Sequence, residues 1–184
     1  ELGALPHDTL LFWHIDSFPS LAAATRAGSA RSTAVRSLGH WWLFTLAPEA
    51  WRATGGWPVA RIGPLPLIPA DSFAAVYMEG VFRPGMQSTV HRHPGVEAWY
   101  TLVGAQCLET PRGRLVQRAG GPGVMVPGGD PMQLVAAGHV FRSGIAGQVV
   151  DVEAIELQQS FEEHADLHLR AADPRGPVRR QHEA

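Results

Sequence analysis

Residues 85–104, GMQSTVHRHPGVEAWYTLVG, decide the fold of this chain and carry its clearest chemistry. His91 and His93 stand two apart at the end of an apolar run, so on a strand their imidazoles share one face while Arg92 points to the other. A Pro-Gly pair then turns the chain, and Glu97 follows on the next strand. Two imidazoles and a carboxylate on adjacent strands form three corners of a metal site, although such a His pair alone is more often structural or exposed.

Short apolar runs separated by Gly- and Pro-containing turns surround this stretch, over residues 73–152. Runs this short and this evenly punctuated predict a closed or nearly closed antiparallel β-barrel. The runs expected to form strands are Ala74–Phe82, Thr89–His93, Ala98–Val103, Gln106–Glu109, Leu115–Arg118, Val124–Val126, Met132–Ala136, Val140–Arg142 and Gln148–Val152.

Residues 1–72 predict an N-terminal extension that packs on the barrel. Five of the six Trp lie in this part, which indicates a layer with a large buried area. Ser17 or Ser20 is the expected cap of a short helix that Gly28 ends. The elements expected here are a strand at Leu10–Ile15, a helix at Leu21–Arg26, strands at Thr33–Leu38 and His40–Leu46, and a stiff extended connector at 63–69.

Residues 153–184 predict a short C-terminal helix followed by a tail. Apolar residues recur there at helical spacing, with acidic residues between them. These apolar residues are Ile155, Phe161, Ala165 and Leu169. The extension, the barrel and this segment are expected to form one domain overall.

The composition bounds the function. A chain of 184 residues suits one domain with its own core, and a net charge of −2 argues against nucleic acid as a partner. The apolar runs are too short to span a membrane, and a single cysteine, Cys107, excludes an internal disulfide. All cations are Arg, and Lys and Asn are absent, as expected of a GC-rich bacterial genome. The start at Glu1 favours a processed, exported or periplasmic form over a cytoplasmic one, without fixing the compartment.

Two motifs resemble those of the cupin superfamily. Every position of the first motif is matched by Gly85, His91, His93, Glu97 and Gly104. The first half of the second motif is matched, at the expected distance, by Gly121, Pro127 and Gly129. The resemblance implies an all-β fold, a double-stranded β-helix or jelly-roll-like barrel.

The resemblance also implies a ligand set. Cupins usually hold one metal with two His and one Glu of the first motif and a His of the second. Carried over, His91, His93 and Glu97 would bind a single divalent or transition metal ion, with iron, manganese, zinc, nickel and copper left open. A small-molecule ligand at the mouth of the barrel and a homodimer are further expectations.

The second motif departs from the family pattern at its metal-binding position. Met132 stands where the motif has its His, and Ala136 where it has its Asn. Met132 is then an apolar filler beside a three-ligand site, or a thioether ligand that suits copper, or the mark of a barrel that binds no metal. His139 is a weaker source of a fourth imidazole.

Several residues are candidates for a substrate pocket. Trp99 and Thr101 share a strand face with Glu97, and Tyr77 is a further candidate, with core packing as the alternative for all three. Arg142 would clamp a carboxylate substrate. The resulting hypotheses are a metal-dependent enzyme of unresolved dioxygenase, isomerase or lyase type, a non-catalytic copper- or small-ligand-binding protein, and a vestigial metal-free barrel.

Overall fold

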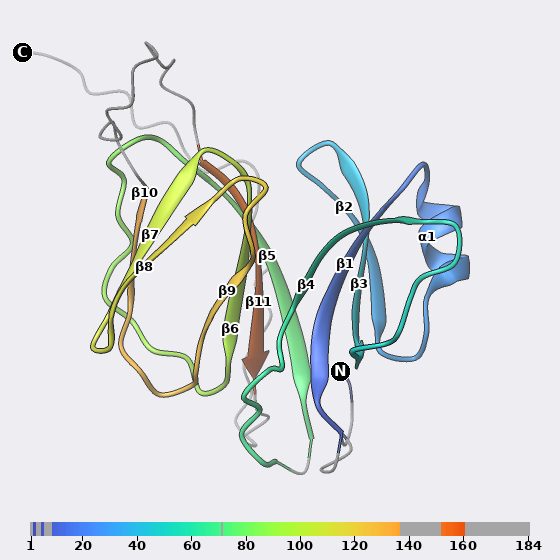
Figure 1. Cartoon of the computed structure of the whole chain (residues 1–184), viewed down its shortest axis with the longest axis horizontal. Coiled ribbons are helices and arrows are strands. Elements are labelled where there is room, and N and C mark those ends of the chain that lie inside the picture. The colour runs from blue at the N-terminus through green and yellow to red at the C-terminus, as the bar shows by residue number, and fades with distance from the viewer. Residues whose placement is uncertain (1, 3–4, 6–8, 71, 137–151, 161–184) are drawn as a thin grey trace, which may run out of the picture.

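The computed structural model describes residues 2, 5, 9–70, 72–136 and 152–160, the last of these by its backbone. In this part of the chain the strands form three antiparallel sheets with a single short helix, which confirms the all-β expectation. The sheets stack as three layers, with the N-terminal sheet on one side and the barrel on the other (Figure 1).

The N-terminal sheet has the strand order β2-β3-β1-β4. Its elements are β1 (Leu11–Phe18), α1 (Leu21–Ala27), β2 (Ser32–Ser37), β3 (His40–Pro48) and β4 (Trp57–Ile62). The hydroxyl of Ser20 accepts the N–H of Ala23 at 3.2 Å and caps α1, which ends at Gly28 as expected. The sequence did not indicate β4, because Pro58 interrupts its pattern. The strand tolerates this proline at the edge of the sheet, where it pairs with Asp16 beside a register shift.

Two sheets face each other in the second half of the chain. One has the order β5-β11-β6-β9 and the other the order β10-β7-β8. The strands are β5 (Ala74–Phe82), β6 (Glu97–Val103), β7 (Ala105–Thr110), β8 (Gly113–Arg118), β9 (Val124–Val126), β10 (Gln133–Ala136) and β11 (Val152–Ser160).

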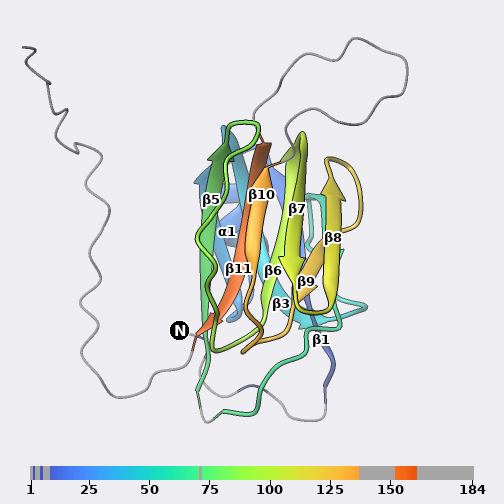
Figure 2. The ribbon, with the colours of Figure 1, turned by 90° about the vertical axis from the view of Figure 1, so that its left-hand side faces the viewer.

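The segment between β5 and β6 runs antiparallel along β10 and extends the smaller sheet. The N–H of Ser88 donates to the oxygen of Leu134 at 2.9 Å, and the N–H of His91 to that of Met132 at 3.0 Å. Two four-stranded layers therefore enclose the interior, as a jelly-roll barrel requires. Figure 2 shows that the strands of both layers run along about the same direction.

Strand β11 corrects the expectation of a helix after residue 152. Val152–Ser160 lies between β5 and β6 and pairs antiparallel with both. Of the apolar residues at helical spacing, only Ile155 lies in this strand. Pairing on two sides decides its conformation, because strand formation depends on partners that are distant in sequence. The barrel thus reaches Ser160. Residues 137–151 and 161–184 lie outside the described part. The expected strand at Val140–Arg142 falls there, as does the expected strand at Gln148–Val152 except for Val152 itself, which begins β11.

The side chains of β6 alternate between two cores. Ala98 and Tyr100 pack toward the N-terminal sheet, in a cluster that includes Trp13 and Phe44. Trp99 belongs instead to a cluster inside the barrel. The side chains of β6 are therefore buried on both faces, against the N-terminal sheet on one face and inside the barrel on the other.

Candidate metal centre

His91, His93 and Glu97 meet at one end of the barrel. One ligand atom of each lies within 4.8 Å of those of the other two. Glu97 opens β6, while the two histidines sit on the segment that runs along β10. The sequence therefore predicted correctly that these three side chains come together, and among the described residues they are the one such group.

The ring of His91 is oriented by the backbone carbonyl of Thr89, two residues before it. Its Nδ1 lies 2.7 Å from the carbonyl oxygen of Thr89. A carbonyl oxygen only accepts, so Nδ1 carries the hydrogen and Nε2 keeps its free electron pair. Metal-binding histidines are commonly held in this way, with one nitrogen donating to a carbonyl and the other left for the ion. No signal in the sequence indicated this role for Thr89.

His93 and Glu97 form a direct pair. Nε2 of His93 lies 2.9 Å from Oε2 of Glu97, and the two side chains are 18% and 3% exposed. A carboxylate this deeply buried needs a partner with positive character, because burying an unpaired charge is costly. The pair is open to solvent on the histidine side and closed on the carboxylate side.

The turn at Pro94-Gly95 lies close to the loop at Gly128-Gly129, and this contact holds the backbone of His93 in place. The N–H of Gly129 donates to the oxygen of His93 at 2.8 Å. A Cβ on the neighbouring Gly128 would lie only 2.5 Å from the oxygen of Pro94 and 2.8 Å from the Cα of Gly95. Only glycine fits there, so Gly128 contributes to the site although the motif leaves its position free.

Met132 lies directly opposite His91. The two residues exchange both backbone hydrogen bonds, at 3.0 and 2.8 Å, so their side chains share a face. Met132 is 2% exposed and packs in an apolar cluster with Trp99, Leu108 and Val126. These surroundings favour a packing role for the thioether.

Two of the residues expected to line a substrate pocket, Trp99 and Thr101, are buried in the barrel interior. Trp99 and Thr101 face the barrel interior with Glu97 but are only 1% and 0% exposed, so they fill this space. The hydroxyl of Thr101 donates to Oε1 of Gln117 at 2.9 Å, and Nε2 of Gln106 donates to the same oxygen at 3.0 Å. The interior therefore runs from the histidine end through an apolar belt to a buried amide cluster.

Tyr77 is not brought to this site, which corrects its placement. Its ring stacks on Phe44 at 4.7 Å and lies 6.2 Å from Trp13, against the N-terminal sheet. Burial raises the pKa of its hydroxyl above the ordinary value. Side chains alternate between the two faces of β5, and the side chain of Tyr77 lies on the face that the N-terminal sheet covers. Arg142 and His139 fall outside the described residues.

The donor set of the three-residue group suits one metal ion. Bonds from a transition metal to imidazole nitrogen or carboxylate oxygen are about 2.0–2.2 Å, so two ligands of one ion lie up to about 4.4 Å apart. A spread within 4.8 Å needs only a small adjustment. Two imidazoles and a carboxylate fit iron, manganese, nickel or zinc, and three protein ligands leave positions for another molecule.

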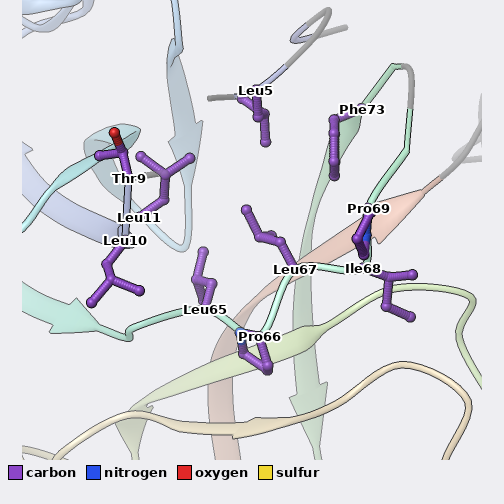
Figure 3. Close-up of a pocket in the computed structure, with 10 residues that line it drawn as sticks. All are labelled: Leu5, Thr9, Leu10, Leu11, Leu65, Pro66, Leu67, Ile68, Pro69 and Phe73. Carbon is purple, nitrogen blue, oxygen red and sulfur yellow. The ribbon is translucent and has the colours of Figure 1, made fainter. Parts of the chain in front are cut away.

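An apolar pocket lies away from these ligands, between the start of β1 and the connector after β4 (Figure 3). Its volume is about 230 Å³, and Thr9 is the one lining residue with a polar side chain. Leu11, Leu65 and Phe73 form buried walls. The pocket offers hydrophobic contact and none of the chemistry of the histidine end.

Comparison with known proteins found structural similarity only. No protein-family model and no curated protein matches the sequence. A cupin domain from Bordetella pertussis Tohama I is similar in structure, with 20% identity over 47% of this chain and 82% of that chain and a TM-score of 0.35. The KdgF structure from Halomonas sp. has 18% identity, 50% and 80% coverage and a TM-score of 0.36.

A cupin superfamily protein from Desulfitobacterium hafniense DCB-2 has 11% identity, covers 51% of this chain and 72% of its own, and gives a TM-score of 0.37. Within the chain itself, two facing antiparallel layers and the first-motif side chains gathered at one end form the arrangement that the motifs predicted.

Proposed function

Starting from a barrel of the cupin type, we propose that this protein is a metalloprotein that binds one divalent transition metal ion through His91, His93 and Glu97. The remaining coordination positions bind a small oxygen-bearing molecule. The observation that carries the proposal is the convergence of these three side chains, with Nε2 of His91 left free by the bond from Nδ1 to Thr89.

Each side chain has a separate role in this proposal. The two neutral imidazoles supply nitrogen donors, and Glu97 offsets one positive charge of the ion. When bound, the ion would supply Lewis acidity, or oxygen activation if it is iron. The chain excludes water from the inner side, because Trp99 and Met132 close the barrel beneath the ligands. Small ligands are therefore favoured over large ones.

Metal content after purification and after loading with zinc or iron tests the proposal. We expect about one equivalent in the wild type and a loss of at least tenfold in affinity for His91→Ala. His40→Ala is the matched control, because His40 is an exposed histidine on β3 of the N-terminal sheet. Metal binding that survives in His91→Ala, or is absent from the wild type, would contradict the proposal.

A second candidate is a non-catalytic copper-binding protein that uses Met132. The observation in its favour is the backbone pairing of Met132 with His91, which places both side chains on one face. Met132→Leu would then lower the affinity for Cu(I) sharply while the fold survives. Unchanged Cu(I) affinity excludes a thioether ligand, and Met132→His would in either case add an imidazole at this position.

The remaining expectations stay predictions. Whether the centre is catalytic depends on the ligand, and the homodimer is tested by light scattering of the purified protein. Within the described part of the chain, no helix has the length and apolar character that crossing a membrane would require.

A further inference from the structure

Trp99 buries its indole N–H without an acceptor among the described residues. Its side chain is 1% exposed, and Nε1 is closed to solvent. A buried indole N–H usually finds a hydrogen-bond partner, and a group left without one requires an explanation.

The position of Trp99 links it to the proposed metal centre. It follows Glu97 by two residues on β6, so both side chains enter the barrel from the same face. It also packs in one cluster with Met132 and Val126. These two residues are the backbone partners of His91 and Glu97 respectively, so the indole packs among the residues that lie opposite two of the proposed ligands.

The charge of the centre indicates which ligand would bind there. A divalent ion held by two neutral imidazoles and one carboxylate keeps a net positive charge, which attracts anionic oxygen ligands. Nε1 of Trp99 is closed to solvent, so bulk water does not supply an acceptor for its hydrogen, and a ligand oxygen would have to reach it from the metal side. An indole N–H only donates, and it therefore pairs with an oxygen acceptor.

We propose that Trp99 is a specificity residue whose indole N–H donates a hydrogen bond to an oxygen of a small carboxylate bound at the metal. This inference rests on the proposed metal centre. It narrows the ligand class to small carboxylates and similar oxyanions, because the ligand must present one oxygen to the ion and another acceptor to the indole. The packed layer around Trp99 and Met132 excludes bulky substituents.

The test is a titration of the zinc-loaded protein with sodium acetate, followed by the nitrogen-15 and proton resonances of the indoles. The six Trp give six indole signals, and Trp99→Phe identifies the one from Trp99. We expect acetate to move the Trp99 proton signal downfield, as a new hydrogen bond does. We also expect Trp99→Phe to bind acetate about tenfold more weakly while its zinc affinity stays unchanged.

Trp13 is a matched control. Its indole N–H is also buried and unpartnered among the described residues, but it lies in the cluster between the N-terminal sheet and the barrel. Its signal should stay in place during the titration, and Trp13→Phe should keep the wild-type acetate affinity. A shift of both signals would indicate a general effect and overturn the inference.

The other outcomes separate this inference from the metal site. Zinc binding that depends on His91, together with a Trp99 signal that acetate does not move, overturns the inference and leaves the metal centre standing. This is the result expected if a buried water is the partner of the indole. Failure of zinc to bind overturns the metal centre and the inference with it. If Trp99→Phe does not fold, single Trp→Phe substitutions at the other five tryptophans assign the Trp99 signal by elimination, and the wild-type titration then decides the matter.

Discussion

Asp16 provides a quantitative test of how burial acts in the N-terminal sheet. This residue of β1 is 6% exposed, and burial raises the pKa of its carboxyl from 3.8 to about 6 despite the nearby positive charge of Arg52. The folded protein therefore holds this proton more tightly than the unfolded chain does. The contribution of this carboxyl to stability is fully present below about pH 4 and is lost as the pH rises through about 6.

The substitution Asp16→Asn removes the charge and keeps the shape of the side chain. A rise in pKa from 3.8 to about 6 corresponds to a penalty of about 3 kcal/mol when the group is ionised. At pH 8 we expect the variant to be more stable than the wild type by about 1–3 kcal/mol, or about 3–9 °C in melting temperature for a chain of this size. At pH 4 the two should be equal within about 0.5 kcal/mol.

The assay is urea unfolding of both proteins across this pH range, with the difference between them as the readout. The difference matters because His14, on the same face, titrates as well. Burial lowers the pKa of His14, so its contribution to stability is lost as the pH falls, and it cancels between the two proteins. Glu109→Gln, at an exposed ion pair with Arg114, is a control expected to change little. An Asp16→Asn variant that is less stable than the wild type at pH 8 would refute the burial argument.

Three further predictions concern the barrel. Gly128→Ala should lower the melting temperature and the zinc affinity together, since the new methyl would meet the oxygen of Pro94; unchanged values in a thermal scan and a zinc titration would contradict this. Gln117→Leu should cost about 3 kcal/mol in urea unfolding, because it leaves the hydroxyl of Thr101 and other buried groups without partners. Zinc at about 100 times the wild-type dissociation constant should stabilise the wild type by about 2.7 kcal/mol. His91→Ala, which binds at least tenfold more weakly, should gain about 1.4 kcal/mol or less, and calorimetric melting curves measure both values.

The parts of the molecule that depend on neighbours in sequence could be predicted. The cap at Ser20, the stop at Gly28 and the exact span of β5 follow from local signals, and these need no knowledge of the fold. The meeting of His91 with Glu97 is also a local event, because a short turn joins two adjacent segments.

The parts that depend on distant partners could not be predicted. Strand β11 begins where the sequence predicts a helix, and only pairing with β5 and β6 makes it a strand. The direction of Tyr77 follows from which face of β5 the extension covers, and no local signal carries that information. Whether Trp99 lines a cavity or fills it depends on side chains of the opposite sheet, such as Leu108 and Leu134.

Strand β6 packs against the N-terminal sheet on one face and carries Glu97 on the other, so the N-terminal extension helps to position a ligand of the proposed metal centre. Tyr100 and Ala98 are anchored on its outer side by the aromatic residues of the extension, while Glu97 projects from its inner side. A change in packing between the N-terminal sheet and the sheet that contains β6 would displace this strand and alter the reach of the carboxylate without touching any ligand. Selection or engineering could therefore tune the affinity of the centre from the opposite face of the sheet, and a barrel cut free of its extension would expose an apolar surface and lose that support.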